Sequence, residues 1–247
     1  EVETTHGPVR ARTLLDARPP TPRNLAPVLT QQFLGWHVAS RTPAFDPTRV
    51  TLMDFWTDAD GRLLFGYILP YGEREALVEI TRLSPEPIPD LARDARALRD
   101  YLARRLGIAD FSIHYREQGA IPLGVPAVPW PDAPAGYHAI GARAGLVRPS
   151  TGYAFMAIQR WSQAFAAACV AAPGPVQAPR AYSRLSGWLD GILLARLRAA
   201  PDATAETFLS FFEHASADAT VRFLSDRASA RDYAEVIAAM PTWPLLR

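Results

Sequence analysis

The sequence has very little cysteine: one residue, Cys169, among 247. A lone cysteine excludes an internal disulfide framework and a metal site built from several thiolates. Cys169 lies in the alanine-rich run "AFAAACVAA", and because small thiols pack well in protein cores, we expect it to be buried. The fold must therefore depend on packing of the hydrophobic residues, which make up 49% of the chain.

Long apolar runs and an excess of one charge are also missing. No segment approaches the roughly 18 to 20 consecutive apolar residues of a membrane-spanning helix, and "EVETTHGPVR" at the start has no apolar core like that of a signal peptide. The 26 Lys and Arg residues balance 25 Asp and Glu residues. A net charge of +1 gives no reason to expect a nucleic-acid partner. This composition is typical of a globular protein with a substantial core.

Common metal and nucleotide motifs are absent as well. The five histidines show no i, i+4 pairing and no partner at metal-ligand spacing, so we expect no metal centre; they are His6, His37, His114, His138 and His214. The run "GARAG" lacks the Lys-Ser/Thr ending of a P-loop, and no serine sits in a nucleophile elbow.

The first half of the chain is rich in extended segments. A short strand ending at Leu15 is followed by "QFLGWHV", "RVTLMDFW", "RLLFGYILP" and "ALVEIT", and the Asp-Gly in "TDADG" is a strong hairpin signal. We expect an antiparallel meander of four strands, with one face packed on a core and the other free for a ligand.

Helical patterns follow. Asp90 is placed to cap a helix that ends at Gly107, and its many charges predict a solvated face. The strands "FSIHYREQGAIPL" and "YHAIGARAG" come next, then a long helix from about residue 153 to 172 and a helical tail from residue 182. This order predicts an α+β, or mixed α/β, architecture.

Two acids within apolar strands are candidates for catalysis. In "EALVEIT" the strand period puts Glu79 on one face with Leu77 and Thr81. It is either an acid that burial keeps protonated or a solvent-facing residue of an edge strand. Asp54 in "VTLMDFW" shares a face with Trp56. It either acts together with Glu79, if the strands bring the two carboxylates together, or has a structural role in which it bonds a nearby backbone amide.

The segment "IGARAGLVRPSTGYAF" runs directly into the long helix. Ser150 or Thr151 can cap that helix, and Gly152 would let a ligand approach the backbone. The pattern fits either a binding site for an anion at the helix amino terminus or an ordinary capped helix.

Taken in order, several segments resemble the lycopene beta-cyclase family of flavin-dependent carotenoid cyclases, in its bacterial form. The resemblance covers nearly the whole chain and rests on "LLDARPP", "QQFLGWHV", "TLMDFW", "FGYILP", "ALVEIT", "REQGAIPL", "IGARAGLVRPSTGYAF" and the helical tail. The family also has an amino-terminal glycine-rich dinucleotide motif, which these residues do not contain. We therefore expect the chain to correspond to about the last two thirds of such an enzyme and to retain FAD weakly by itself.

The resemblance implies a division of the chain into four parts. Residues 1–30 would be the residual end of a Rossmann-like FAD-binding domain, and residues 31–135 would be a substrate domain with an antiparallel sheet. Residues 136–175 would return to complete the FAD domain, and residues 176–247 would form a helical carboxyl-terminal region.

It also implies roles for individual residues. The family's acid motif Phe-Leu-Glu-Glu-Thr reads Leu77, Val78, Glu79, Ile80 and Thr81 in this chain, so Glu79 would be the acid. The residues that would contact FAD are Asp16, Arg18, Gly141, Gly145, Pro149, Thr151, Gly152 and Tyr153. The aromatic residues Trp36, Trp56 and Tyr67 would either stabilise a carbocation or serve only in packing.

The implied activity is cyclisation of the linear ends of lycopene to β-ionone rings, by way of γ-carotene to β-carotene, without net redox. Reduced FAD, with electrons from NAD(P)H, would stabilise the cation. The partners would be a carotenoid and a membrane surface, with peripheral attachment on the cytoplasmic side. The alternatives are a flavin-dependent monooxygenase or reductase of the same broad fold acting on a lipophilic substrate, and a lipid-binding remnant without activity.

Overall fold

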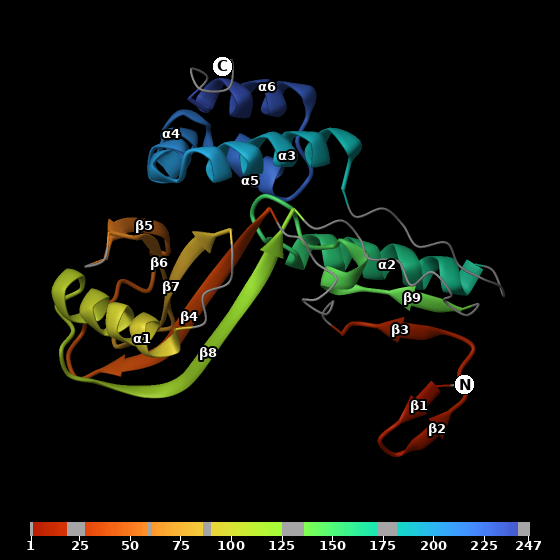
Figure 1. The fold of residues 1–247 in the computed structure, drawn as a ribbon, viewed down its shortest axis with the longest axis horizontal. Coiled ribbons are helices and arrows are strands. Elements are labelled where there is room, and N and C mark those ends of the chain that lie inside the picture. Colours follow the sequence, from red (N-terminus) through yellow and green to blue (C-terminus); the bar gives the residue numbers. More distant parts are fainter. Residues whose placement is uncertain are drawn as a thin grey trace. The chain divides into compact units, whose positions relative to one another are not determined.

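The computed structural model describes residues 2–18, 28–58, 61–85, 90–124, 136–171 and 182–241. These residues form nine strands and six α-helices, which confirms the predicted mixed α/β class (Figure 1). The chain divides into two compact units. The sheet unit comprises residues 28–122 and 200–205, and the second unit comprises residues 1–27, 123–199 and 206–247.

The sheet unit contains a five-stranded sheet. Its strands are β4 (Leu29–Ser40), β5 (Thr51–Thr57), β6 (Leu63–Pro70), β7 (Glu75–Ser84) and β8 (Phe111–Leu123), in the spatial order β5-β6-β7-β4-β8. All the predicted strands exist, but the four-strand meander is wrong because β4 pairs with β7 and not with β5. The Ser40 N–H donates to the carbonyl of Arg74, 2.8 Å away, so the end of β4 lies beside β7 before the chain turns toward β5.

The two faces of this sheet differ in burial. Val38, Val78 and Ile80 are at most 2% exposed on one face, which α1 (Leu91–Asp100) and the π-helical turn η2 (Tyr101–Arg105) cover. We call this the helix face. Because side chains alternate along a strand, the intervening residues lie on the opposite face, which includes Glu79. We call that the Glu79 face.

Helix α1 is fixed at its start by its cap and by an ion pair in its first turn. The Asp90 side chain accepts a hydrogen bond from the backbone N–H of Arg93, as the capping pattern predicts. The expectation that all charges of this helix face solvent is wrong for Asp94. Asp94 is buried against Arg82 of β7, with Nη1 and Oδ1 2.7 Å apart. The opposite charge and the two hydrogen bonds of Arg82 offset part of the cost of burying the Asp94 carboxylate.

The second unit contains two small sheets. Strands β1 (Val2–Thr4) and β2 (Gly7–Val9) form an antiparallel hairpin that the sequence analysis did not predict. Strands β3 (Leu14–Asp16) and β9 (Tyr137–Ala139) pair in parallel, and the 3-10 turn η3 (Gly141–Ala144) follows β9.

Helix α2 (Phe155–Ala171) begins two residues later than predicted and buries Trp161 and Phe165. These two rings stack with centroids 4.8 Å apart over Leu146. Cys169, however, is exposed, so the prediction of a buried thiol is wrong. Among the described residues, the cluster that packs around Trp161 and Phe165 includes no residue from the following turn of α2, where Cys169 lies.

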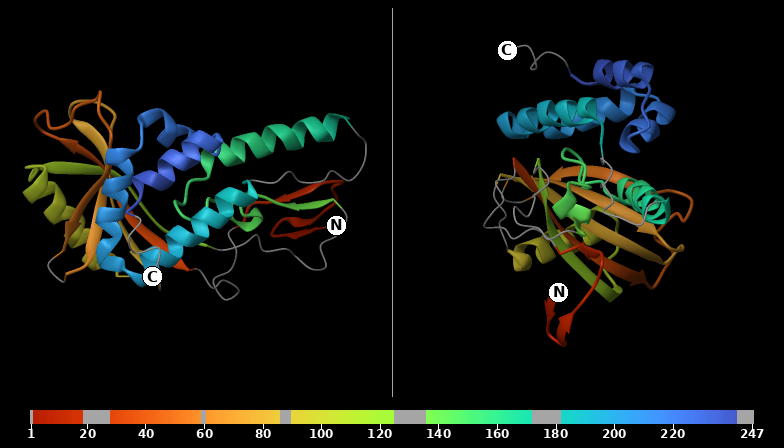
Figure 2. Two further views of the ribbon diagram at one scale, coloured as in Figure 1. Left: turned by 90° about the horizontal axis from the view of Figure 1, so that it is seen from above. Right: turned by 90° about the vertical axis from the view of Figure 1, so that its right-hand side faces the viewer.

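The predicted helical tail is confirmed as α3 (Arg184–Ala199), α4 (Thr204–His214), α5 (Ala217–Leu224) and α6 (Ala230–Ala239). Figure 2 shows these helices grouped together. Phe211, Phe223 and Val236 form a core that α4, α5 and α6 share. Ser229 and Asp232 form a capping box at the start of α6, which satisfies free backbone amides there.

Candidate functional sites

Glu79 lies in the middle of β7, directly opposite Tyr67 of β6 and Gly35 of β4. Its carboxylate Oε1 accepts a hydrogen bond of 3.0 Å from the Thr81 hydroxyl. Partial burial raises the pKa of Glu79 to about 7, and the charge of Glu117 adds to this rise while the Thr81 bond opposes it. Glu79 is therefore an acid that holds its proton close to neutral pH.

The Glu79 face is lined with aromatic rings next to this acid. Tyr67 packs edge-on against Phe65, with ring centroids 5.5 Å apart, and Phe65 also contacts Phe55. Phe33 and Phe65 both lie opposite Thr81 in the ladder. Of the three aromatic residues singled out from the sequence, only Tyr67 is brought to Glu79. The aromatic residues that the sequence analysis missed include Phe33. It alternates with Leu34, which is buried on the helix face, and this alternation was the signal that could have placed Phe33 on the opposite face.

The structure does not bring Asp54 and Glu79 together. Asp54 is opposite Gly66, and Gly66 is opposite Ile80, so Asp54 lies on the helix face. There it accepts hydrogen bonds from the Tyr101 hydroxyl at 2.9 Å and from Arg105 Nε at 3.1 Å. These contacts connect β5 to the turn η2, a structural role similar to one of the two alternatives considered for Asp54, although its partners are side chains.

Trp36 and Trp56 also lie on the helix face. Trp36 is 3% exposed, with the guanidinium of Arg99 5.4 Å from its ring centroid. Trp56 stacks on Tyr101 with centroids 4.5 Å apart. Both positions favour the packing role for these residues over a role beside Glu79.

Asp16 stands at the carboxyl end of β3, as expected, and organises the basic residues around it. Arg18 donates two hydrogen bonds of 2.8 Å to its carboxylate, and the Tyr137 hydroxyl donates a third of 2.9 Å. The bonds from Arg18 hold the pKa of Asp16 well below its usual range. Arg143 of η3 lies 3.7 Å from the same carboxylate, so the ends of β3 and β9 carry two guanidinium groups around one acid.

The glycine-rich step after β9 is open at its start. Gly141 has φ +63°, a left-handed conformation that favours glycine, and a Cβ atom built there would meet nothing within 4 Å. Gly145 ends the 3-10 turn, with its N–H donating to the carbonyl of Ala142.

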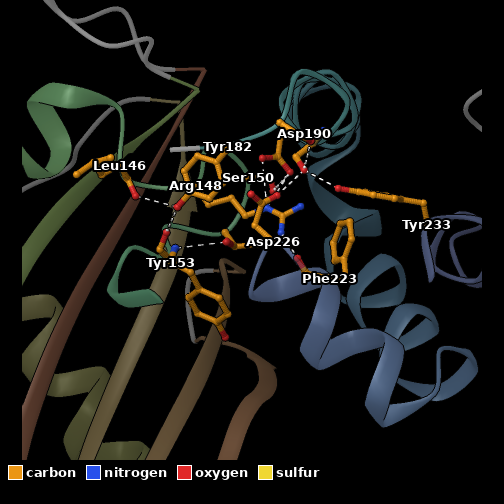
Figure 3. A network of polar contacts seen from close by, with 12 residues as sticks. Leu146, Arg148, Ser150, Tyr153, Tyr182, Asp190, Phe223, Asp226 and Tyr233 are labelled. Atoms are coloured by element: carbon orange, nitrogen blue, oxygen red, sulfur yellow. Dashed lines mark hydrogen bonds and ion pairs between the residues drawn. The ribbon is translucent and has the colours of Figure 1, made fainter. Parts of the chain in front are cut away.

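The next segment, residues 146–153, is held in place by a buried arginine (Figure 3). Arg148 Nε lies 3.2 Å from the carboxylate of Asp190 on α3, and Ser150 Oγ donates a 2.7 Å bond to the same carboxylate. Arg148 Nη1 also donates to the carbonyl of Phe223, and its guanidinium stacks 4.2 Å from the centroid of the Phe223 ring.

The same segment positions the remaining residues predicted to contact FAD, which are Pro149, Thr151, Gly152 and Tyr153. The N–H of Gly152 donates to the carbonyl of Arg148, and the N–H of Arg148 donates to that of Tyr153, which closes a tight turn. Tyr182 donates its hydroxyl to the carbonyls of Leu146 and Tyr153. The Tyr153 side chain remains 39% exposed.

Sequence analysis did not identify Arg148 and Asp190, which bring this segment and α3 together. A charged residue directly before a proline within an apolar, glycine-rich stretch was the available signal, but its partner lies 42 positions away.

Comparison with known proteins places the chain in a family. The sequence model described as "Lycopene cyclase protein" matches residues 2–247. This chain belongs to the lycopene cyclase family.

A curated relative supports the same conclusion. The chain is 28% identical over 255 residues to the lycopene beta-cyclase of Paracoccus sp. (strain N81106 / MBIC 01143). The match covers 96% of the chain but 63% of that relative, so the chain spans less than two thirds of its length.

A solved structure has a similar fold. This is a geranylgeranyl bacteriochlorophyll reductase-like protein from Thermoplasma acidophilum, with a TM-score of 0.54 and 16% sequence identity. The match covers 96% of the chain and 62% of that protein, and at this level of identity it bears on the fold alone.

Two features are absent from the part of the chain that the structure describes. Among those residues, no helix is long and apolar enough to cross a membrane, and no group of three or more His, Cys, Asp and Glu side chains is placed to hold a metal ion.

Proposed function

We propose that the protein to which this chain belongs cyclises the ψ-ends of lycopene to β-ionone rings, by way of γ-carotene to β-carotene. The observation that carries the proposal is Glu79. It is a partly buried acid with a pKa of about 7, surrounded by aromatic side chains, at the position that resembles the catalytic acid of the family. Membership of the lycopene cyclase family supports the choice of a carotenoid as substrate.

The chemistry requires one proton to enter and one to leave, without net redox. In the proposed reaction, Glu79 donates its proton to the terminal C1=C2 double bond of the polyene. The neighbouring C5=C6 bond captures the resulting cation and closes the ring, and loss of a proton then restores a double bond. A carboxylic acid that remains protonated near neutral pH is suited to the first step.

The neighbours of Glu79 support this role physically. Thr81 fixes one carboxylate oxygen, so the acid has a defined direction relative to the sheet. Tyr67 is aligned with Glu79 across the ladder, where its ring could stabilise a carbocation through its π face. Phe65 and Phe33 supply the apolar surroundings that a polyene requires.

The residues of the second unit fit the phosphate-rich part of a dinucleotide such as FAD. The open backbone at Gly141 permits close approach of a phosphate group. Arg143, two residues further along the chain, and Arg18, which follows β3 across the β3–β9 pair, offer positive charge near Gly141. We propose that these residues, with Gly145, Pro149, Thr151, Gly152 and Tyr153, hold FAD. Bound in its reduced form, with electrons from NAD(P)H, FAD would supply negative charge that stabilises a carbocation.

Because the proposed substrate is apolar and dissolves in membranes, we also propose that the protein attaches peripherally to the cytoplasmic side of a membrane. Exposed Phe155 and Met156 at the start of α2 are the kind of side chains that such attachment requires.

The test uses full-length protein with FAD, NAD(P)H and lycopene in detergent or vesicles, with products separated by chromatography. Wild-type protein should form β-carotene, and Glu79→Gln should lose at least about 10²-fold in rate. Glu73→Gln, which changes an exposed carboxylate of the same unit, is the control and should retain activity. Undiminished product with Glu79→Gln would rule out this residue as the acid.

The same assay separates cyclisation from the alternative of a flavin-dependent monooxygenase or reductase of the same broad fold. A cyclase consumes no NAD(P)H in proportion to product, because the reaction is an isomerisation. Stoichiometric oxidation of NAD(P)H coupled to product would support the alternative instead.

A further inference from the structure

A second carboxylate lies beside Glu79, and a glycine makes the room for it. Gly35 of β4 is the cross-strand partner of Glu79. A Cβ atom built on Gly35 would lie 3.0 Å from Cγ and 3.1 Å from Oε1 of Glu117. The Glu117 side chain, which comes from β8, therefore rests on the backbone of Gly35 in the place that any larger residue would fill.

The sheet order places strand β4 between the two glutamates. Strand β8 lies at the edge of the sheet, next to β4, and β4 separates it from β7. Directly opposed residues of adjacent strands are about 5 Å apart, so a side chain from β8 that lies over the backbone of β4 reaches the neighbourhood of Glu79. Gly35 therefore lets a carboxyl group from a non-adjacent strand approach Glu79 on the same face of the sheet.

The other titratable groups on this face are distributed differently. Tyr67 faces Glu79 from β6, and the Thr81 hydroxyl lies on the same strand. His37 lies two residues beyond Gly35 on β4, but its Nε2 is 3.5 Å from the carboxylate of Glu75. Among the described residues that face Glu79 from these strands, Glu117 contributes the negative charge that raises the pKa of Glu79.

We infer that Glu117 and Glu79 act as a pair, in which Glu117 is a positioning residue whose negative charge keeps the proton on Glu79, and that Gly35 is required because it admits Glu117 to the pair. The catalytic part of this inference rests on the proposed function, whereas the pairing of Glu117 with Glu79 rests on the geometry. Two carboxylates in a partly buried site resist double ionisation, so the pair retains one proton at a pH at which an isolated glutamate would have lost it. Glu117 thereby keeps Glu79 protonated, so that Glu79 can donate this proton in the proposed reaction.

The test measures the titration of Glu79 in the 247-residue chain. The ¹³C signal of its side-chain carboxyl, assigned by its loss in Glu79→Gln, is followed against pH by NMR. Glu117→Gln keeps the shape of the side chain but removes its charge, so the midpoint of the Glu79 titration should fall by roughly 0.5 to 1 pH unit. Glu117→Asp, which restores a carboxylate, should recover part of the shift.

Two further variants complete the design. Gly35→Ala places a methyl group where Glu117 lies and should lower the midpoint in the same direction as Glu117→Gln. Glu73→Gln, which removes one exposed charge from the sheet unit, should leave it unchanged. An unchanged midpoint in both Glu117→Gln and Gly35→Ala would overturn the inference.

The pair and the proposed function can fail separately. In full-length protein, the alkaline limb of the pH profile of kcat/KM, where Glu79 loses its proton, should move to lower pH together with the Glu79 midpoint in Glu117→Gln. A shifted NMR midpoint without any lycopene cyclisation would retain the pair and reject the function. Cyclisation that depends on Glu79, with an unchanged midpoint in both Glu117→Gln and Gly35→Ala, would retain the function and reject the pair.

Discussion

Arg148 and Asp190 form an ion pair from which water is excluded, with side chains 0% and 1% exposed and Nε 3.2 Å from Oδ1. Removing one partner leaves the other charge buried without compensation. We therefore expect Arg148→Met or Asp190→Asn alone to lower the free energy of unfolding by about 3 to 5 kcal/mol, measured by urea denaturation.

The control for this prediction is Asp218→Asn, because Asp218 pairs with Arg222 at 3.9 Å on the surface with its side chain 89% exposed. That change should have little effect. The double variant Arg148→Met/Asp190→Leu should recover part of the stability, since it replaces two buried charges by apolar groups. Equal effects of Asp190→Asn and Asp218→Asn would contradict the structural role of the buried pair.

Stability should depend on pH through Glu79. Its folded-state pKa of about 7 lies above the ordinary value of 4.5, so the native state binds this proton more tightly than the unfolded chain does. As the pH rises from 4.5 through about 7, ionisation progressively removes this advantage and the free energy of unfolding falls, by about 1 to 3 kcal/mol in total. Glu79→Gln lacks this ionisation, so its stability should fall less over the same range. Parallel pH curves for the two proteins would refute the prediction.

Asp54 should matter for stability and little for activity. Asp54→Asn weakens the contacts to Arg105 and Tyr101, and we expect a loss of about 1 kcal/mol in the free energy of unfolding. In the full-length protein, cyclisation by Asp54→Asn should fall less than about tenfold, because Asp54 lies on the face opposite Glu79. A loss as large as that of Glu79→Gln would give Asp54 a direct part in the chemistry.

Gly66 is predicted to be intolerant of a side chain. A Cβ atom at this position would lie 2.8 Å from both Cζ and the hydroxyl oxygen of Tyr101, a buried ring that cannot move freely. Gly66→Ala should cost about 1 to 3 kcal/mol through this clash. Gly72→Ala is the matched control, since a Cβ there meets nothing within 4 Å and should leave the thermal midpoint nearly unchanged.

Local patterns were sufficient to predict most of the elements. Asp90 caps α1, and the strands around Trp36, Asp54, Tyr67 and Glu79 all form. Strand order was not accessible in this way, because the place of β4 beside β7 depends on tertiary pairing and not on the pattern of either strand. The exposure of Cys169 was missed for a similar reason. Composition indicates that a small thiol packs well in a core, but it does not indicate which part of a helix other residues cover.

In the candidate site, too, residues with a local sequence signal were predictable, and residues that depend on tertiary contacts were not. Glu79 was identifiable from one strand, since an acid among alternating apolar residues is a local signal. Its neighbours were not, because Glu117 reaches it across the intervening strand β4 and only the absence of a side chain at Gly35 permits the approach. Arg148 likewise acquires its meaning from Asp190, which is remote in sequence.

The parallel pairing of β3 with β9 has a consequence for the order in which the protein folds. Leu14 of β3 pairs with Tyr137 of β9, and the five strands β4 to β8 lie between them in the sequence. All strands of the five-stranded sheet are therefore synthesised before β3 can pair with β9. Closing a loop of this length is entropically unfavourable, and three paired residues give little return. We therefore expect the β3–β9 pair, with the Tyr137–Asp16 bond that joins its ends, to be among the last contacts formed during biosynthesis and the first released during unfolding.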